Sequence, residues 1–468
     1  METSSLDAQM YMQIEPDWEK AEESCWLDVY ERTVQISTPK AQERAQNERI
    51  IAEVHTTPSH QYQLPLSTSI QAPVEPSLVQ IMDKRDLRID VQVDLKTFKS
   101  PTKQLRTVFQ APKETVDVSV LGYSEAVVTP LSPLLQLYSI DVCKDERFVV
   151  LGGSNGVCML WDSQNKTQML PLLGHVADVT CVRFFPSSQV VLTGSLDFTL
   201  RIFSVHGRCA AVLKGHRGGV EDVSIVGRGR NVLSCGTDGL IQLWNCGTQD
   251  IVAKWSNDDH SPVHCLSVMD DTAQLLVEGN YSPCLNENEV ETDGKVFFAG
   301  LDNGETLGVD VRAREAVLNV DGVAGSIISC AASTSTASLP MLFTGSEDGV
   351  LTAWDLRHTS SEQFLTTSLA THSAPLHALS RSSSPIDSIS VSGSLANDPV
   401  SASSVWTAHG DGVCCNWSNL GNKPYVSNEL TGPHHDAVRG IALASQTGRV
   451  FSACRDGRLR VYVPPVVA

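Results

Sequence analysis

The chain has 468 residues with 35 Lys and Arg against 54 Asp and Glu, a formal net charge of −19, and 41% of its residues are hydrophobic. This composition is typical of a globular protein with enough apolar material for a core. Because binding to a phosphate backbone needs a basic surface, the acidic balance argues against nucleic acid as the main partner. No run approaches the roughly 18–20 apolar residues that cross a bilayer, so we expect no membrane partner.

The start of the chain and its cysteines indicate the compartment. The first twenty residues lack a basic segment followed by an apolar one, as a secretory signal would have. The 13 cysteines include no C-x-x-C pair, and most lie in strand-like runs, where a thiol packs as a small apolar group. We therefore expect neither a disulfide framework nor a metal site, no cofactor, and a cytoplasmic and nuclear protein.

Residues 1–113 are expected to form a small, partly irregular N-terminal region. Apolar and aromatic residues gather around an acidic stretch at 14–30. Residues 40–53 have helical propensity with a thin apolar face, and 55–80 are rich in Pro, Ser, Thr and Gln, which indicates a linker-like stretch. Residues 87–95 alternate between apolar and polar residues, which predicts a strand.

One short signature then recurs seven times: Asp or Asn, usually Gly, and an apolar alternation that ends in a large residue. Its copies begin at Asn155, Asp197, Asp238, Asn303, Asp348, Asp411 and Asp456. Asp-Gly and Asn-Gly are hairpin signals because these residues tolerate positive φ. Strand-like runs flank each signature, which gives four antiparallel strands per unit of about 40–45 residues. The pattern predicts an all-β, seven-bladed β-propeller over residues 114–468.

Three features complete the predicted ring. Two unusually long spacings indicate insertions, one acidic near 279–295 and one rich in serine near 380–404, and both are expected to be surface loops. The last signature ends at Tyr462, which leaves too little chain for a fourth strand in the seventh blade. We expect residues 114–122 to supply that strand, because the open edge of the blade needs a cover.

The signatures and the Gly-His pairs at 174–175 and 215–216 resemble WD repeats. Two sets of residues match the buried hydrogen-bond relay of that family: His216, Ser234, Asp238 and Trp244, and His372, Thr407, Asp411 and Trp417. An Asp in a tight turn can orient a buried imidazole whose second nitrogen needs its own partner, and a satisfied relay makes a blade rigid. A catalytic dyad uses the same residue types, but recurrence in several blades indicates architecture.

Motifs for catalysis are missing from the sequence. It has no phosphate-binding loop, nucleophile elbow, zinc-protease motif or kinase signature set. The single tight polar group, His434-His435-Asp436, stands where WD repeats have their Gly-His turn. We therefore predict a non-enzyme with no catalytic residues.

Residues 174–203 and 214–239 closely resemble the proteasomal ATPase-associated factor family. The most specific stretches are CVRFFPS at 181–187, KGHRGG at 214–219 and GRGRNV at 227–232. The resemblance implies an assembly chaperone of the proteasome regulatory particle base, which binds the C-terminal domains of proteasomal ATPase subunits and restrains premature association with the core particle. The serine-rich insertion and the stretch 40–115 depart from the family pattern.

The contact surface is expected on the rim that bears the turns before the first strand and between the second and third strands of each blade. Candidate residues there are Asp178, Leu196, Phe198, Arg217, Glu221, Glu347 and Arg455. Phe198 replaces the turn glycine, and exposed aromatics and Arg are typical anchors. A tolerated surface substitution is the other interpretation of Phe198. The acidic balance suits a partner with a basic face, although solubility alone also explains it. We expect a monomer when the protein is free.

Two other functions stay open at this stage. Trp354-Asp355-Leu356-Arg357 matches the WD-x-R box of substrate receptors of cullin–RING ubiquitin ligases, and residues 309–312 are a partial echo of it. The same tetrapeptide arises readily in a WD repeat, so a scaffold of another complex is a further alternative. An affinity purification separates the three functions by the proteins that it recovers.

Overall fold

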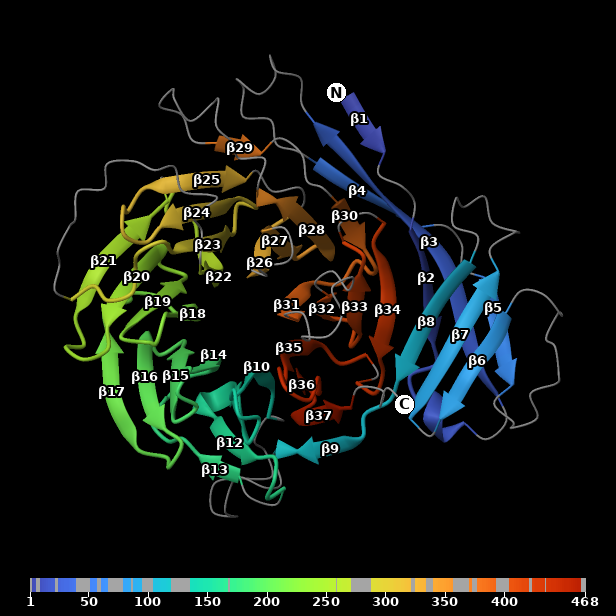
Figure 1. Cartoon of the computed structure of the whole chain (residues 1–468), viewed down its shortest axis with the longest axis horizontal. Helices are drawn as coiled ribbons and strands as arrows, with labels where there is room; N and C mark the ends of the chain where they lie inside the picture. Colours follow the sequence, from blue (N-terminus) through green and yellow to red (C-terminus); the bar gives the residue numbers. More distant parts are fainter. Residues whose placement is uncertain are drawn as a thin grey trace.

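The ring of the protein is visible in the computed structural model (Figure 1). The structure describes residues 2–5, 9–21, 24–38, 51–56, 60–65, 79–85, 87–94, 104–118, 135–166, 169–257, 259–270, 288–320, 325–333, 340–356, 370–372, 377–392, 404–420, 423–433 and 435–463. Among these residues, no helix has the length and apolar character that crossing a membrane requires.

Seven sheets succeed one another around a central opening in the described part of the chain (Figure 1). The first three each contain four antiparallel strands in chain order. Blade one consists of β10 (Leu137–Val142), β11 (Phe148–Gly153), β12 (Cys158–Asp162) and β13 (Met169–Pro171), with a 3-10 turn at Ser154–Gly156. Blade two consists of β14 (Val179–Phe184), β15 (Val190–Ser195), β16 (Thr199–Ser204) and β17 (Cys209–Lys214). Blade three consists of β18 (Val220–Val226), β19 (Asn231–Gly236), β20 (Leu240–Asn245) and β21 (Ile251–Ser256).

The next three blades keep the four-stranded plan, and two of them gain strands at the outer edge. Blade four consists of β22 (Val263–Met269), β23 (Val296–Leu301), β24 (Thr306–Asp310) and β25 (Ala316–Val320), and β29 (Ala370–His372) adds to β25 in parallel. Blade five consists of β26 (Ile327–Ser333), β27 (Met341–Ser346), β28 (Val350–Asp355) and β30 (His377–Ser380). Blade six consists of β31 (Ile386–Ser392), β32 (Ser404–His409), β33 (Cys414–Ser418) and β34 (Tyr425–Leu430).

Blade seven closes the ring with a strand from the N-terminal side. It contains β35 (Val438–Leu443), β36 (Val450–Cys454) and β37 (Arg458–Tyr462), and its outer strand is β9 (Glu114–Asp117). β9 pairs antiparallel with β37, so that Val116 stands opposite Leu459. This is the pairing expected for residues 114–122, of which Glu114–Asp117 form the strand.

The described N-terminal residues form two sheets. One contains β1 (Glu2–Ser5), β2 (Gln9–Ile14), β3 (Ser24–Thr38), β4 (Ile51–Thr56) and β5 (His60–Pro65). The other contains β6 (Val79–Arg85), β7 (Arg88–Asp94) and β8 (Gln104–Gln110), and it continues blade six because β8 pairs in parallel with β34. A short 3-10 turn, Trp18–Lys20, follows β2. The two sheets share one apolar core that includes Trp18, Leu27, Val91 and Phe109.

The structure corrects two sequence expectations in this part of the chain. β5 and part of β4 lie inside the stretch 55–80 that was expected to be linker-like, and β4 begins within 40–53, where helical propensity was noted. Since both strands pair with the long β3, tertiary pairing overrides the local composition. The strand expected at 87–95 is present as β7. The division of the chain at residue 113 stays a prediction, because β8 belongs to the same sheet as blade six.

The serine-rich stretch 380–404 needs a further correction where the structure describes it, and residues 393–403 lie outside the described part. We expected a surface loop, yet Ile386–Ser392 forms β31, the innermost strand of blade six. Ser388 and Ser390 line the central cavity, while Ile386 is fully buried. A strand that faces a polar opening on one side needs few apolar residues, so its composition resembles that of a loop. Of the acidic insertion near 279–295, residues 271–287 lie outside the described part, and Asn288 binds to blade three through its carbonyl oxygen.

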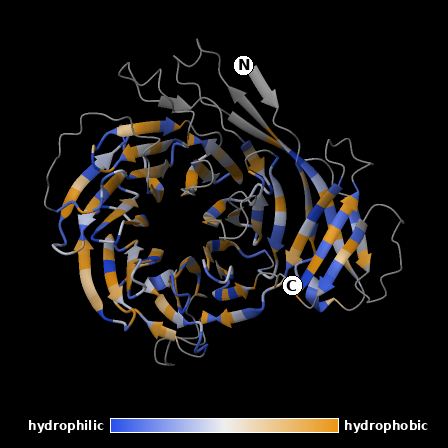
Figure 2. Ribbon diagram, viewed as in Figure 1, coloured by the Kyte–Doolittle hydropathy of each residue, from blue (hydrophilic) through white to orange (hydrophobic). Residues whose placement is uncertain are grey.

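Apolar side chains pack between neighbouring blades. The cluster between blades seven and one includes Phe451 and Trp161, and the one between blades two and three includes Leu200 and Trp244. Figure 2 shows hydrophobic residues concentrated on the strands and hydrophilic ones in the turns. The turns at the two rims therefore connect strands that are held in place by the buried core.

Candidate protein-interaction site

Four residues of blade three form a continuous hydrogen-bond relay. The indole Nε1–H of Trp244 donates to Ser234 Oγ at 2.8 Å, and that oxygen lies 2.7 Å from His216 Nε2. His216 Nδ1 lies 3.0 Å from Asp238 Oδ2. Because an ionised carboxylate can only accept, Nδ1–H donates to Asp238, and Nε2 of the neutral imidazole then accepts the hydroxyl of Ser234. The structure thus brings together all four residues of the first predicted relay, and the relay joins the turn before β18 to the turn after β19.

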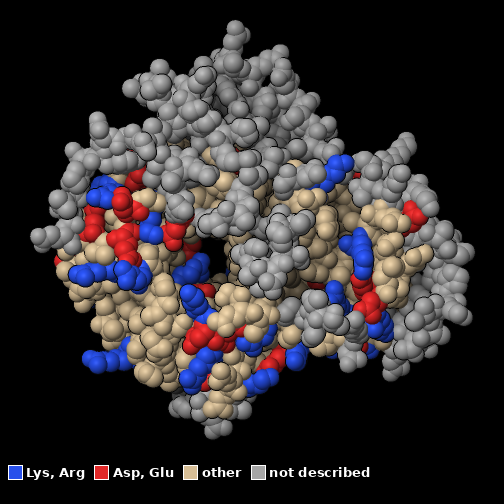
Figure 3. Space-filling view, viewed as in Figure 1, with Lys and Arg blue, Asp and Glu red and all other residues tan. Residues whose placement is uncertain are grey.

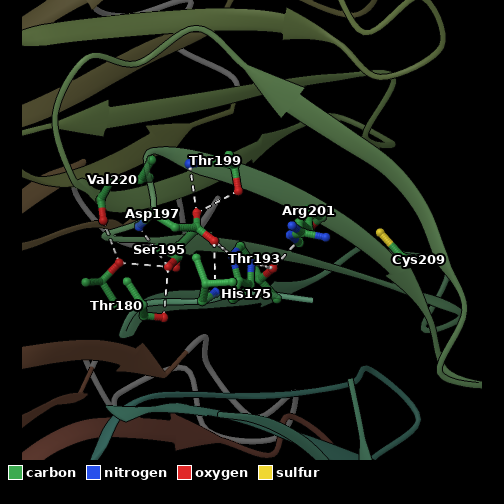
Figure 4. A network of polar contacts seen from close by, with 12 residues as sticks. His175, Thr180, Thr193, Ser195, Asp197, Thr199, Arg201, Cys209 and Val220 are labelled. Atoms are coloured by element: carbon green, nitrogen blue, oxygen red, sulfur yellow. Dashed lines mark hydrogen bonds and ion pairs between the residues drawn. The ribbon is translucent and has the colours of Figure 1, made fainter. Parts of the chain in front are cut away.

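Blade two contains the same arrangement without the indole (Figure 4). His175 Nδ1 lies 2.8 Å from Asp197 Oδ2, and His175 Nε2 lies 2.7 Å from Thr193 Oγ1. Phe203 stands where blade three has Trp244, and its ring packs edge-on against the imidazole. Asp197 also accepts the hydroxyl of Thr199 at 2.6 Å. The turn before β14 is therefore tied to the turn after β15.

The second predicted relay needs a correction. Trp417 Nε1 donates to Thr407 Oγ1 at 2.9 Å as expected, but the imidazole on that hydroxyl is His409, whose Nε2 lies 2.9 Å away. His372 is on β29, where it stands opposite Val320 at the outer edge of blade four. The spacing in the sequence selected His372 because it precedes the blade, whereas His409 comes from the second strand itself. Asp411 accepts the backbone N–H of Val413 in the adjoining turn.

Burial makes these histidines structural groups. The side chains of His175 and His216 are completely buried, and this burial lowers the pKa of both despite the opposing effects of Asp197 and Asp238. Burial likewise lowers the pKa of His409 to about 4. A neutral imidazole closed off from solvent cannot exchange protons with a substrate. The relays therefore stiffen the turns that they join.

Phe198 has an unusual backbone conformation for its residue type. Six of the seven signatures have glycine at this position with φ between 71° and 89°, and Phe198 adopts φ 68°. For a residue with a Cβ, left-handed backbone costs roughly 1–2 kcal/mol. The turn stays intact because Asp197 accepts the N–H of Thr199 and Ser195 accepts the N–H of Phe198. Blade two thus holds an aromatic side chain in a strained turn at the rim.

Four apolar side chains around this turn form a surface that we name the blade-two patch. Leu173, Val176, Leu196 and Phe198 are 67%, 84%, 39% and 48% exposed. They are half of the large hydrophobic side chains that are exposed in the described part of the chain. Two flank the Gly-His pair before β14 and two flank Asp197 after β15, so the His175–Asp197 contact brings both pairs together. Exposed apolar side chains that lie together are typical of interaction sites, so the blade-two patch is a candidate contact surface.

The blade-two patch rests on close backbone contacts. The N–H of Val176 donates to Asp197 Oδ2 at 3.3 Å, and the N–H of Leu196 donates to the carbonyl of Asp178 at 2.9 Å. A Cβ at Gly219 would lie only 2.5 Å from Leu196 Cδ2, so Leu196 lies directly on the turn before β18. The patch is consequently preorganised, which lowers the entropic cost of binding.

The other candidate contact residues lie at separate places, and Glu221 lies in the central cavity rather than on the rim. Asp178 accepts the N–H of Asn155 at 2.8 Å and links blades one and two. Arg217 is exposed in the turn before β18, next to the patch, whereas Glu347 and Arg455 are exposed in the turns between the second and third strands of blades five and seven. Glu221 lines the central cavity, and burial raises the pKa of its carboxyl group. The structure brings Leu196, Phe198 and Arg217 together and leaves Glu347 and Arg455 on other blades.

Sequence reasoning missed Leu173 and Val176. A signal was available, because the two Gly-His pairs have different neighbours: Leu and Val flank the pair at 174–175, but Lys214 and Arg217 flank the pair at 215–216. Apolar residues on either side of a buried histidine in a rim turn have to point to solvent. The exposure of Leu173 and Val176 becomes apparent only when residues 173–176 are placed in the turn before β14.

The central opening holds a polar cavity of about 420 Å³ (Figure 3). Two of its acidic residues bind backbone N–H groups of the next blade: Asp141 accepts from Phe184 at 2.6 Å, and Asp222 accepts from Leu266 at 3.0 Å. Burial raises the pKa of both carboxyl groups, and Arg183 lies between them. Within the described residues, no group of His, Cys, Asp and Glu has the arrangement of a metal site. These carboxylates join neighbouring inner strands.

The cysteines of the described chain are single thiols. Most are buried in the blades, and burial raises the pKa of Cys158 to about 12. A thiol that stays protonated in an apolar environment is a poor nucleophile. Their role is to fill space in the core.

The WD-x-R tetrapeptide is only partly visible. Trp354 and Leu356 are buried in blade five, where Trp354 donates to Thr344, while Arg357 lies outside the described residues. In the partial echo, Arg312 forms an ion pair with Asp293 at 2.8 Å. Trp354, the tryptophan of this tetrapeptide, therefore belongs to the core of blade five.

Three parts of the chain match the family model described as "WD domain, G-beta repeat": residues 166–204, 207–245 and 426–462. Each match covers the outer strand of one blade and the first three strands of the next. The repeat of the sequence is thus displaced by one strand from the blade of the structure. This displacement is why the outer strand of blade seven comes from β9.

Several curated proteins with different names are similar in sequence to part of the chain. The chain is 32% identical over 226 residues to the 26S proteasome regulatory subunit RPN14 of Saccharomyces cerevisiae, which covers 47% of this chain and 53% of that protein. It is 24% identical over 194 residues to a guanine nucleotide-binding protein subunit beta-like protein of Encephalitozoon cuniculi, covering 40% and 57%. It is 27% identical over 198 residues to pre-mRNA-processing factor 19 of Bos taurus, covering 42% and 35%. The matches thus span about half of the length of these relatives, or less.

Proposed function

We propose that this WD-repeat propeller is a non-catalytic binding platform that assists assembly of the proteasome regulatory particle base. In this proposal it binds proteasomal ATPase subunits through their C-terminal domains and restrains premature association of the base with the core particle. The observation that carries the proposal is the 32% identity to a 26S proteasome regulatory subunit over 226 residues. The distinctive stretches at 174–203 and 214–239 support the same family.

The geometry of the rim suits such a platform. Buried relays lock the turns of blades two and three, and the exposed side chains lie on a surface that the ring closure keeps in place. Rigid elements of this kind present contact residues at low entropic cost. The proposal includes a cytoplasmic and nuclear location.

Affinity purification of the tagged full chain from cells tests the proposal. We expect ATPase subunits of the proteasome base to be recovered, without subunits of the core particle, because the chain is proposed to act before the two join. Binding of each purified ATPase C-terminal domain, measured by calorimetry, then identifies the subunit. Recovery of cullin–RING adaptors, or of neither group, contradicts the proposal and favours a ligase receptor or another scaffold.

A further inference from the structure

We infer that the blade-two patch docks an acidic amphipathic segment of the partner, one that presents apolar side chains bordered by carboxylates. The identity of the partner rests on the proposed function, whereas the chemistry of the segment rests on the patch alone. The inference is the reverse of what the net charge of −19 suggests, which is a partner with a basic face.

The apolar part of the docking site follows from exposure and strain. Leu173, Val176, Leu196 and Phe198 lie in two turns that the His175–Asp197 contact holds together. Phe198 keeps a side chain at a position where glycine relieves strain in the other six signatures. A strained aromatic that is also half exposed stabilises neither the turn nor the core, which points to a role outside the chain.

Cations border the blade-two patch on two sides. Arg201 lies against Gly174, since a Cβ there would be 2.6 Å from its Nη1, and Gly174 follows Leu173. Lys214 stands opposite Thr199, the neighbour of Phe198, and Arg217 is in the turn on which Leu196 lies. In the described part of the chain, none of these three cations is in an ion pair.

The nearby carboxylates are engaged within the fold. Asp197 bonds to His175 and Thr199, Asp238 bonds to His216 and to the N–H of Arg217, and Asp178 accepts the N–H of Asn155. Although burial opposes ionisation of Asp197, its bonds to Thr199 and His175 lower the pKa of that carboxyl. These bonds hold the carboxylates of Asp197 and Asp238 below the surface, at 6% and 8% exposure, whereas Lys214 and Arg217 are exposed. The charge that a ligand of the patch meets at the surface is therefore mainly positive, and charge complementarity calls for carboxylates on the partner.

Two peptides and two pairs of variants test the inference. The peptides are synthetic 18-residue amphipathic helices with the same Leu and Phe face, one with Glu and the other with Lys on the polar face. The variants of the full chain are Phe198→Ala and the double variant Lys214→Glu/Arg217→Glu. Their matched controls are Tyr425→Ala, at a side chain 44% exposed on β34, and Arg208→Glu, at an exposed side chain at the opposite end of blade two.

We expect the wild-type chain to bind the Glu peptide at least tenfold more tightly than the Lys peptide in fluorescence anisotropy at low salt. Phe198→Ala and the charge reversal each weaken binding of the Glu peptide at least tenfold, and the controls stay within twofold. Higher salt weakens wild-type binding and has less effect on the charge-reversed variant. Equal binding of the two peptides, preference for the Lys peptide, or no binding of either overturns the inference.

The same variants are measured with each purified proteasomal ATPase C-terminal domain. If a domain binds the wild-type chain, Phe198→Ala and the charge reversal are expected to weaken it at least tenfold. Unchanged binding places the contact elsewhere, and tighter binding after charge reversal identifies a basic partner face; both overturn the inference. If no domain binds the wild-type chain, the proposed function fails, and the peptide pair still decides the chemistry of the patch.

Discussion

Phe198 illustrates how one residue departs from the repeat that surrounds it. The Asp or Asn at the start of each signature predicts a tight turn, and the next residue is a glycine with positive φ in six of the seven. Phe198 adopts the same φ with a Cβ, and hydrogen bonds of Asp197 and Ser195 hold the turn around it. The sequence therefore indicates the turn correctly, and the structure shows the strain.

The strain can be measured by comparing two substitutions at this position. Phe198→Gly should be about 1 kcal/mol more stable than Phe198→Ala, because alanine keeps the Cβ at positive φ and glycine removes it. Both variants should lose binding of the partner to the same extent, since both remove the ring. Urea unfolding measures the difference in the free energy of unfolding. Equal stability of the two variants would show that the turn is relaxed.

His409 predicts a pH dependence of stability. Burial lowers its pKa to about 4 in the folded chain, whereas an unfolded histidine titrates near 6.5. Unfolding below pH 6.5 therefore takes up a proton, and the free energy of unfolding falls as the pH decreases from about 6.5 to 4. The loss from this residue approaches about 3 kcal/mol at the lower end.

Urea unfolding at several pH values checks this dependence. His409→Gln should flatten the decrease between pH 6.5 and 4, whatever its effect on stability at pH 7. The control is His206→Gln, at an exposed side chain in the turn between β16 and β17, which should keep the wild-type slope. An unaltered slope in His409→Gln would contradict the burial argument.

At the scale of elements, β9 has the largest consequence for the fold. Four residues from the N-terminal side cover the edge of β37, and their alternation puts Val116 into the core and Thr115 into solvent. Closure by residues 114–122 could be predicted, because the open edge of the last blade needs a cover. Pairing between β8 and β34 could not, since nothing local in either strand specifies a parallel partner so distant in the chain.

Val116→Asp should destabilise the chain by roughly 3 kcal/mol, because it puts a carboxylate without a partner at a buried position and opens the ring. Thr115→Asp introduces the same charge one residue away on the exposed side of β9 and should change stability by less than about 0.5 kcal/mol. Thermal unfolding and size-exclusion chromatography measure the two effects, including association through the freed edge. Similar melting temperatures for the two variants would argue against closure by β9.

The whole molecule combines a strongly negative net charge with mixed local charge. Lys and Arg are interspersed with Asp and Glu on the face drawn in Figure 3, so net charge does not describe any one contact surface. The blade-two patch illustrates this, because three cations lie beside it although the whole chain is strongly negative. The charge of a docking site has to be determined from the pairing of its side chains.

Free chains are expected to be monomeric at micromolar concentration. Equal net charges of −19 repel one another, and four exposed apolar side chains are few compared with the roughly 20–30 residues a side of a stable interface. Sedimentation velocity measures the species present. A dimer that Phe198→Ala dissociates would show that a second copy of the chain occupies the blade-two patch.

The sequence by itself determined the all-β class, the number of blades, the turns and one complete relay, because each depends on residues close together in a repeated pattern. It could not specify which histidine completes the relay of blade six, since His409 and His372 are equally compatible with a linear spacing. The N-terminal sheets, the serine-rich inner strand and the union of Leu173 and Val176 with Leu196 and Phe198 were decided by tertiary structure alone. Each of them depends on contacts between segments that are distant in the chain, and the local composition of a segment does not specify which other segment it contacts.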